Sequence, residues 1–594
     1  MKRIAVKYLF PVALLFYALR NVARGVDLWD GGYNYANFTY GGLKYMDAMW
    51  YFATWLSNVT GSLIIRLPFG HTMIGMNVYT GLLQGGIAVL AYWFCLKHLH
   101  LPFWAAAVGE FLALSLCWAP YAVLYNYLTY GIMLLGVILL YRGLTTGRAG
   151  YLVLAGVVLG LNVGVRFPNL VQAGFILALW YHSLVLRKEK PAKTLSRTGW
   201  CVLGYMGALI FLVLLIAAIY GLDSYFGGIR DLFGISDTAP DYSAGFLLFS
   251  IVETYIDSVS TYWLKRFALL LAAETAVWLV FPRHFYRCKQ ILTVILTTGF
   301  FWYIVQKGYC TPDYASYHAV FYPAIFWILA GILLCLGLLF KKEAAPEEKL
   351  QAVIMLLIIY ITPLGSNNAM YACINNLFLT APWILDQSWK FMREKVHPAC
   401  FPLRVMAVAC SVLLCVQGAG FGSRFVCERA AGARDLAYEI TEIPVLKGMH
   451  TGQESGQELE TLYRYLQTNG LLDKTCILYG DIPGLSYYMQ LAPAMNIWGD
   501  LLSYSPDRMR ADLKEIEAGT AAGMIPDGQI AAEQLPVVIV HTKYAEAKED
   551  PTETQDDLNP TVKEKLDELY IFMHNNGYRR AEDLACRTYA VYLR

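Results

Sequence analysis

Apolar runs long enough to cross a bilayer recur along the first 420 residues and are separated by short polar gaps. A helix needs about 17 to 25 mostly apolar residues to span the hydrocarbon core of a membrane. The pattern therefore predicts a polytopic α-helical membrane protein with about thirteen transmembrane helices. These lie near residues 5–23, 72–96, 103–119, 126–143, 150–166, 168–186, 199–220, 264–281, 290–306, 318–340, 350–364, 371–388 and 402–421.

The polar gaps between these runs alternate in charge. One set is rich in Lys and Arg, and the other set is nearly free of them. The positive-inside rule places basic gaps in the cytoplasm. We therefore expect a cytoplasmic amino terminus and, with an odd number of spans, an extracytoplasmic carboxyl-terminal part. The basic gaps lie near residues 2–7, 97, 142–148, 187–197, 283–289, 341–349 and 390–404.

Two long loops fall on the predicted outer side, at residues 24–70 and 221–265. Both mix aromatic and apolar residues with isolated charges. The segment "YMDAMWYFATWLSNVTGSLIIRL" in the first loop predicts helices lying in the membrane interface, where Trp and Tyr are enriched. Long loops with their own structure are usually functional.

The pattern changes near residue 421, where the apolar runs shorten and charged residues become frequent. Periodicity predicts a small α/β domain over residues 421–594, after a transmembrane domain over residues 1–420. Helices are expected at 455–470 and 559–578, buried strands at 474–481 and 535–544, and an edge strand at 586–594.

One loop of this second domain, "GDIPGLSYYMQLAP", has two interpretations. It is a binding surface with Asp481, Tyr487 and Tyr488 at its rim, or it is a turn punctuated by Pro and Gly.

Composition agrees with the division into two parts. Of 594 residues, 57% are hydrophobic and only 15% are charged, and the mean hydropathy is +0.43, which excludes a soluble globule of this size. Residues 421–594 hold 17 Lys and Arg against 27 Asp and Glu, whereas the rest of the chain has an excess of positive charge. We expect a multi-pass protein of the plasma membrane, with the lipid bilayer and no nucleic acid as partner.

Ionisable residues near membrane depth are costly and therefore point to function. Inside the predicted spans, Glu110, Glu274 and Gln84 each stand alone. A chain of ionisable residues through the spans, as a proton-coupled carrier would need, is not seen. The outer side instead gathers Asp27, Asp30, Arg66, Arg166, Arg230, Lys307, Asp313 and His318.

This outer set suits the transfer of a sugar from a polyprenyl-phosphate carrier. A carboxylate can take the proton from the acceptor hydroxyl. Cations can stabilise the phosphate that leaves. Both groups must lie at the membrane surface, because the lipid carrier cannot leave the bilayer.

The first outer loop opens with "VDLWDGGYNYANF", and it is followed by interfacial helices, further spans and an outer carboxyl domain. This arrangement resembles the GT-C superfamily of membrane glycosyltransferases. The resemblance implies a catalytic Asp early in the loop with an aromatic nearby, which Asp30 and Tyr33 match; Asp27 is the alternative. Gly31 stands where many members have Glu, so metal binding and the identity of the base stay open. If the segment is helical, both carboxylates share one face.

Other stretches fit the same family. Arg166 lies at the outer end of a span, where the resemblance implies a cation for the carrier phosphate; the alternative is an Arg snorkelling to the interface. Lys307, Asp313 and His318 resemble a later outer loop that contacts donor or acceptor, although the aromatic belt explains the neighbouring tyrosines. The gap "PLGSNNAMYACINN" either binds sugar hydroxyls or caps helices. It contains Asn367, Asn368, Asn375 and Asn376.

The leading hypothesis is a glycosyltransferase that inverts the anomeric carbon and uses a polyprenyl-phosphate sugar as donor. Its acceptor would be a glycan, lipid or protein on the outer face. The sequence indicates no specific cofactor, and a divalent metal is compatible with it. A flippase for lipid-linked saccharides is the second hypothesis, and it predicts Glu110, Glu274 and Arg166 along one continuous cavity. A non-catalytic scaffold is the third, and it predicts no pocket beside Asp27 and Asp30.

Overall fold

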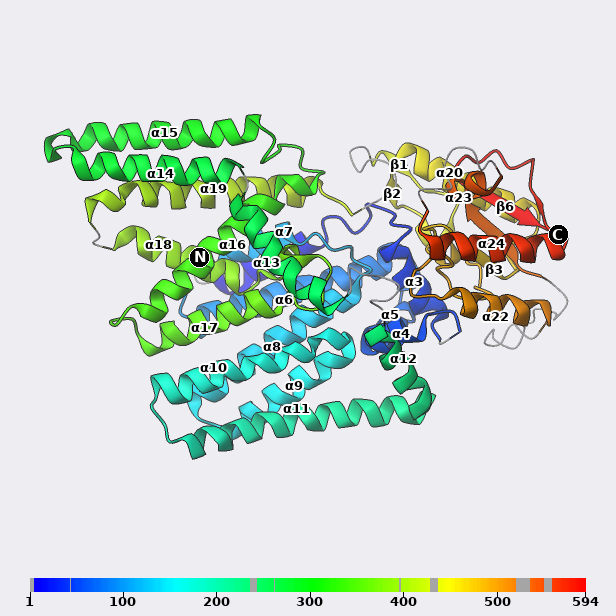
Figure 1. The fold of residues 1–594 in the computed structure, drawn as a ribbon, viewed down its shortest axis with the longest axis horizontal. Helices are drawn as coiled ribbons and strands as arrows, with labels where there is room; N and C mark the ends of the chain where they lie inside the picture. Colours follow the sequence, from blue (N-terminus) through cyan, green and yellow to red (C-terminus); the bar gives the residue numbers. More distant parts are fainter. Residues whose placement is uncertain are drawn as a thin grey trace.

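The computed structural model describes residues 5–42, 44–234, 243–260, 262–394, 397–427, 436–519, 535–549 and 558–594. A large helical part carries a small domain with a mixed sheet at one end (Figure 1). The helices of the helical part are α2 Phe10–Ala18, α3 Asp30–Tyr40, α4 Ala48–Ala53, α5 Trp55–Ile65, α6 Met73–Lys97, α7 Phe103–Leu116, α8 Leu124–Thr146, α9 Ala149–Val165, α10 Ile176–Trp180, α11 Pro191–Tyr220, α12 Leu222–Gly234, α13 Ala244–Ser260, α14 Tyr262–Val280, α15 Tyr286–Gln306, α16 Phe321–Phe340, α17 Pro346–Ile361, α18 Thr380–Arg393 and α19 Phe401–Arg424.

Seven helical segments within the described residues are long and apolar enough to cross a membrane. Three shorter apolar helices, α5, α7 and α9, accompany them. The chain is thus a multi-pass membrane protein by length and composition, and the count of about thirteen spans stays a prediction. The seven segments are Met73–Lys97, Leu124–Thr146, Phe167–Leu186, Pro191–Tyr220, Tyr286–Gln306, Phe321–Phe340 and Pro398–Arg424.

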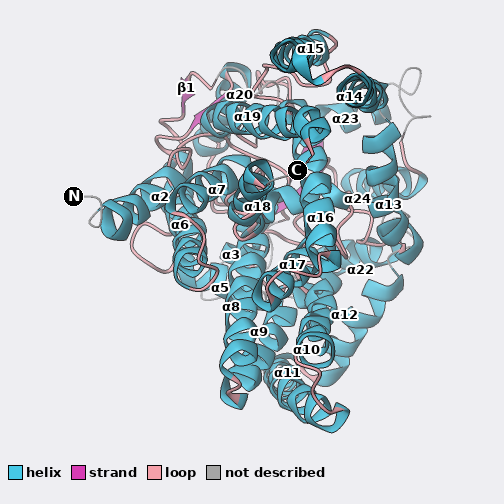
Figure 2. Ribbon diagram, turned by 90° about the vertical axis from the view of Figure 1, so that its left-hand side faces the viewer, coloured by secondary structure: helices cyan, strands magenta, loops and turns pink. Residues whose placement is uncertain are grey.

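The helical part has two flanks. Figure 2 shows α8, α9, α10 and α11 grouped on one side, with α14, α15 and α19 on the opposite side. Helices α9 and α11 approach closely because small residues line their contact: a Cβ on Gly160 would lie 2.6 Å from the Tyr205 carbonyl oxygen. Added Cβ atoms on Gly156 and Gly204 would also overlap backbone oxygens of the facing helix. Small residues four apart let membrane helices pack backbone to backbone.

The two ends of the helical part differ in charge. The turn between α14 and α15 and the turn between α10 and α11 lie at the end far from the carboxyl domain (Figure 1). Both turns belong to the gaps predicted to be cytoplasmic because of their Lys and Arg. The short helices α3, α4 and α5 of the first predicted outer loop lie at the other end, against the carboxyl domain (Figure 1).

The carboxyl domain contains the predicted helices and strands. Helices α20 and α24 confirm the helical pattern, and β3 and β4 pair in parallel as two buried strands. The prediction of a terminal edge strand is wrong: β6 lies between β4 and the two-residue strand β5, in the sheet order β3-β4-β6-β5. The elements are β1 Tyr438–Glu439, β2 His450–Thr451, α20 Gln453–Thr468, β3 Cys476–Tyr479, α21 Leu485–Tyr488, α22 Pro506–Glu517, β4 Val537–His541, α23 Thr542–Glu549, α24 Pro560–Asn575, β5 Arg579–Arg580 and β6 Tyr589–Leu593.

A lysine is buried where this domain meets the first outer loop. Lys565 of α24 has no exposed surface, and its ammonium group donates to the Leu501 carbonyl oxygen at 2.7 Å. Burial lowers the pKa of Lys565 to about 8, although the nearby carboxylates of Asp500 and Asp47 favour the charged form. The folded protein therefore holds this proton less tightly than the unfolded chain does.

This burial predicts a rise in stability with pH. Between pH 8 and 10.5 the unfolded chain keeps the Lys565 proton while the folded domain has lost it, so the free energy of unfolding increases. We expect a gain of about 3 kcal/mol across this window from a shift of this size. Hydrogen exchange of the β3 and β4 amides in the full-length protein measures this gain in the free energy of unfolding. The same measurement on Lys565→Met at each pH cancels the intrinsic pH dependence of exchange. If the free energy of unfolding changes equally with pH in wild type and in Lys565→Met, the prediction is contradicted.

Candidate functional site

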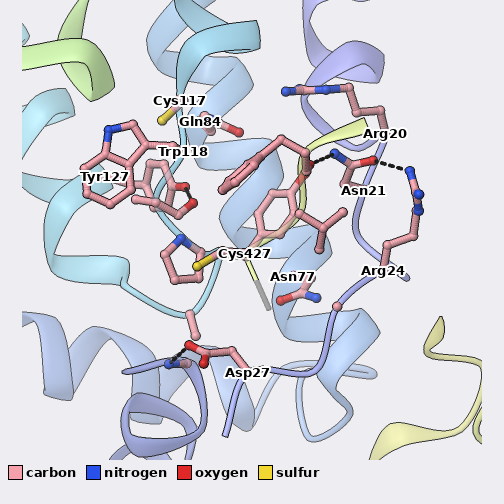
Figure 3. A pocket seen from close by; sticks show the side chains of 18 of the residues that line it. Arg20, Asn21, Arg24, Asp27, Asn77, Gln84, Cys117, Trp118, Tyr127 and Cys427 are labelled. Carbon is pink, nitrogen blue, oxygen red and sulfur yellow. Dashed lines mark hydrogen bonds between the residues drawn. The ribbon is translucent and has the colours of Figure 1, made fainter. Parts of the chain in front are cut away.

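A cavity of about 60 Å³ lies where the ends of several helices meet the first predicted outer loop (Figure 3). Three of the described lining residues are charged: Arg20, Arg24 and Asp27. The other lining residues are Asn21, Gly25, Gly31, Tyr35, Met73, Asn77, Gln84, Ser115, Cys117, Trp118, Ala119, Pro120, Tyr121, Ala122, Tyr127, Phe421, Gly422, Phe425, Val426 and Cys427.

Asp27 lines this cavity at the point where α3 is about to begin. Its side chain is 3% exposed, and its Oδ2 accepts a hydrogen bond from the Gly31 amide at 2.7 Å. Its Oδ1 accepts from the Trp29 amide at 3.2 Å. The first N–H groups of a helix lack partners within the helix, and a carboxylate there also meets the positive end of the helix dipole. The carboxylate is therefore held in one place at the cavity wall.

Gly31 allows this close approach. A Cβ added to Gly31 would lie 3.0 Å from both the Cβ and the Oδ2 of Asp27. A side chain at position 31 would therefore require the Asp27 side chain to shift by a few tenths of an ångström.

Arg20 and Arg24 lie one helical turn apart after α2. The Arg20 guanidinium donates to the carbonyl oxygens of Gly422, Tyr17 and Leu114, the last at 3.0 Å. It therefore joins the ends of α2, α7 and α19. Arg24 makes longer contacts, from Nη1 to Asn21 Oδ1 at 3.4 Å and to the Ser423 carbonyl oxygen at 3.5 Å.

Neutral polar groups cover the wall between the arginines and Asp27. Asn77 Nδ2 donates to the Val22 carbonyl oxygen at 2.8 Å, and Asn77 Oδ1 accepts from the Tyr35 hydroxyl. Gln84, which the sequence places alone inside a span, is buried and lines the same cavity. Asn77 thereby holds the segment that leads from α2 to Asp27.

Aromatic rings form part of the remaining wall. The rings of Phe421 and Phe425 stack with centroids 4.2 Å apart. The loop that carries Trp118 is held by Asn375, whose Oδ1 accepts from the Trp118 amide at 2.7 Å and from the Ala119 amide at 3.2 Å. In the "PLGSNNAMYACINN" gap, Asn375 therefore binds the backbone of the loop between α7 and α8. Asn367 and Asn368 are exposed and do not line the cavity.

Asp30 and Tyr33 lie outside the lining of this cavity. Asp30 is half-buried and is the first residue of α3, so Asp27 precedes the helix and the two carboxylates do not share a helical face. Tyr33 is buried, with its ring edge-on to Trp498 of the carboxyl domain at 5.3 Å. Burial raises the pKa of Tyr33 well above its ordinary value.

The other predicted cations and anions are also elsewhere. Arg166 donates from Nη2 to the Gly365 carbonyl oxygen at 2.7 Å and lies over the Tyr125 ring. Lys307 and His318 are exposed, and Asp313 is half-buried, with its Oδ1 3.4 Å from the amide nitrogen of Ala315. None of these four lines the cavity at Asp27.

Arg20 and Arg24 are not among the site residues predicted from the sequence. A signal was present for Arg20, because it falls inside the first predicted span, 5–23, where an ionisable residue points to function.

A metal site is not seen in the part of the chain that the structure describes. Those residues contain no group of three or more His, Cys, Asp or Glu side chains that could hold a metal ion.

Comparisons with known proteins give structural matches only. No protein-family model matches the sequence, and no curated protein matches it. The chain is similar to the Archaeoglobus fulgidus oligosaccharyltransferase complexed with zinc and sulfate, with 12% identity and a TM-score of 0.45, over 93% of this chain and 70% of that one.

The same oligosaccharyltransferase tethered to an acceptor peptide matches with a TM-score of 0.43 and 12% identity, over 95% of this chain and 72% of that one. ArnT from Cupriavidus metallidurans, bound to undecaprenyl phosphate, matches with a TM-score of 0.40 and 12% identity, over 98% of this chain and 97% of that one. All three matches are likenesses of overall structure to GT-C membrane glycosyltransferases, at low sequence identity and high coverage of this chain.

Proposed function

We propose that this protein is a membrane glycosyltransferase that moves a sugar from a polyprenyl-phosphate donor to an acceptor hydroxyl at the outer face of the plasma membrane. The observation that supports this most is the pairing of one buried carboxylate, Asp27, with two arginines in one cavity. The cavity lies beside the first outer loop, among helix ends that face the carboxyl domain. In this proposal the lipid-borne donor and the water-side acceptor meet there. The acceptor is a glycan, a lipid or a protein.

In the proposed reaction Asp27 acts as the general base. It takes the proton from the acceptor hydroxyl as the oxygen of that hydroxyl attacks the anomeric carbon. The bond from the anomeric carbon to the phosphate oxygen breaks, and polyprenyl phosphate leaves with the bonding electrons. A single displacement of this kind inverts the anomeric carbon. A positioned base contributes about a hundred- to ten-thousandfold in rate.

The two arginines have different roles in this proposal. Arg20 is held by three carbonyl oxygens from three elements and keeps the cavity wall together. Among the described residues the Arg24 guanidinium makes only long hydrogen bonds, at 3.4 and 3.5 Å, so it can turn toward a phosphate at little cost. Charge-assisted bonds from Arg to phosphate oxygens are about twice as strong as neutral hydrogen bonds. We therefore assign the departing phosphate to Arg24.

Replacing Arg24 with Ala is expected to raise the KM for the donor about tenfold or more, because a charge-assisted bond contributes about 1.5 to 3 kcal/mol. The assay follows release of polyprenyl phosphate from a panel of sugar-labelled donors by the purified full-length protein. Arg66→Ala is the control, because Arg66 is an exposed outer-loop arginine that does not line the cavity. Equal KM values for the two variants would remove Arg24 from the site, and wild-type protein that releases nothing from any donor would contradict the function itself.

The described residues do not favour the flippase hypothesis. It predicts Glu110, Glu274 and Arg166 along one cavity, yet Glu110 is buried in α7, Glu274 is buried in α14, and Arg166 is held by Gly365. None of the three lines the cavity at Asp27. The scaffold hypothesis predicts no pocket beside the first carboxylates, whereas Asp27 lines one.

A further inference from the structure

We infer that the carboxyl domain completes the catalytic site by holding the backbone of the Asp27 segment, with Tyr488 as the main positioning residue. This inference rests on the proposed role of Asp27 as the base. It assigns the loop "GDIPGLSYYMQLAP", which the sequence analysis interpreted as a binding surface or a turn, to binding the first outer loop of the same chain.

Tyr488 contacts the main chain of the proposed base directly. It is the last residue of α21 and has no exposed surface. Its hydroxyl donates to the Asp27 carbonyl oxygen at 2.6 Å. Four residues earlier, the Gly484 amide donates to the Leu28 carbonyl oxygen at 3.0 Å. Two consecutive carbonyl groups of the first outer loop are therefore held by one turn of the carboxyl domain.

A second attachment lies on the other side of Asp27. The His450 amide donates to the Ala23 carbonyl oxygen at 2.8 Å, and the Gly25 amide donates to the His450 carbonyl oxygen at 2.8 Å. The segment from Ala23 to Leu28, which contains Arg24 and Asp27, thus spans two points of the carboxyl domain that are far apart in sequence. A segment fixed at both ends cannot shift along the cavity wall.

The contact is close because glycines face each other. A Cβ on Gly484 would lie 2.9 Å from the Gly32 Cα, and one on Gly32 would lie 3.0 Å from the Asp27 carbonyl oxygen. Around this point, the rings of Tyr35 and Tyr487 stack with centroids 5.1 Å apart, and the Tyr487 hydroxyl donates to the His71 carbonyl oxygen at 2.8 Å. The contact is therefore a packed interface as well as a set of hydrogen bonds.

These contacts matter for the chemistry because a base must lie within hydrogen-bond reach of the proton it removes. A displacement of about 1 Å can lower a rate about a hundredfold. Catalytic groups are held to about 0.5 Å by the residues that support them. Tyr488 supports Asp27 through its backbone and does not touch the reacting atoms.

Tyr488→Phe tests this inference, because it removes only the hydroxyl. Tyr479→Phe is the matched control: Tyr479 is equally buried, and its hydroxyl donates to the Val562 carbonyl oxygen within the carboxyl domain. We expect kcat to fall about three- to tenfold in Tyr488→Phe with the donor KM unchanged, and neither constant to change in Tyr479→Phe. A kcat for Tyr488→Phe equal to that of the control would overturn the positioning role.

A second measurement does not depend on the reaction. Hydrogen exchange of residues 26–34 in the full-length protein is expected to be faster in Tyr488→Phe than in wild type, and unchanged in Tyr479→Phe. If exchange is faster but no donor is turned over by any variant, the attachment stands and the proposed function fails. Exchange that is the same in all three proteins would overturn the attachment, whatever the assay of transfer shows.

Discussion

Replacing Asp27 with Asn is expected to lower sugar transfer by about a hundred- to ten-thousandfold, whereas Asp30→Asn leaves it within about threefold of wild type. The reason is geometric. Asp27 is 3% exposed at the wall of the cavity that holds both arginines, while Asp30 is half-buried on α3 outside that wall. Asn keeps the size of Asp and one carbonyl oxygen, but it cannot take a proton from an acceptor hydroxyl.

The measurement is the initial rate of transfer from a labelled polyprenyl-phosphate sugar, at saturating donor, for the two variants side by side. Because Asp27 also accepts the Gly31 amide at the start of α3, Asn at this position keeps an acceptor but loses the negative charge at the positive end of the helix dipole, which contributes about 0.3 to 1 kcal/mol. A thermal melt of each variant therefore accompanies the assay. A folded Asp27→Asn protein with wild-type activity, or an inactive Asp30→Asn protein, would assign the base elsewhere.

The second large effect is expected at Gly32. In Gly32→Ala the new Cβ would overlap the Gly484 Cα and lie 3.0 Å from the Gly484 nitrogen. These are backbone atoms, so no side-chain rotation relieves the overlap and the two segments must separate. We expect a loss of about 1 to 3 kcal/mol of stability and at least a tenfold loss of transfer, because the Asp27 segment leaves its position.

Gly42→Ala provides the control for this substitution. Gly42 lies in the same outer loop, and a Cβ there would meet nothing within 4 Å. The melting temperature and the transfer rate of the two variants are compared in one detergent preparation. If Gly32→Ala melts and transfers like Gly42→Ala, then the glycine contact does not hold the loop against the carboxyl domain.

Much of the fold could be predicted from local pattern. The helix α20 and the strands β3 and β4 follow from hydrophobic periodicity over a few residues. The place of β6 could not be predicted in this way. It alternates like an edge strand, but the two-residue strand β5 pairs with its outer side, and so short a strand leaves no periodic signal.

The choice between Asp27 and Asp30 depends on contacts that are remote in sequence. The family resemblance favoured Asp30 because of the aromatic residue after it. Which carboxylate lines the cavity depends on where α3 begins, and that point is held by Gly484 and Tyr488, more than 450 residues away. No pattern within the first outer loop encodes such a contact.

Local sequence pattern also does not identify which arginines and lysines line the cavity. Arg166 is predicted from its position at a span end, which many snorkelling residues share, and Lys307 from its place in a later outer loop. Whether such a residue joins a given cavity depends on how the helices pack. Arg24 reaches the cavity because Arg20 ties α2 to the ends of α7 and α19.

The most direct test of the proposed transferase uses a polyprenyl-phosphate sugar labelled in both its sugar and its lipid, added to sealed vesicles that contain the full-length protein. We expect the two labels to separate: the sugar gains a new glycosidic bond with inverted configuration, the lipid remains as polyprenyl phosphate, and Asp27→Asn prevents the separation. A donor that crosses the bilayer with both labels still joined, or labels that separate equally fast in Asp27→Asn, would contradict the proposal.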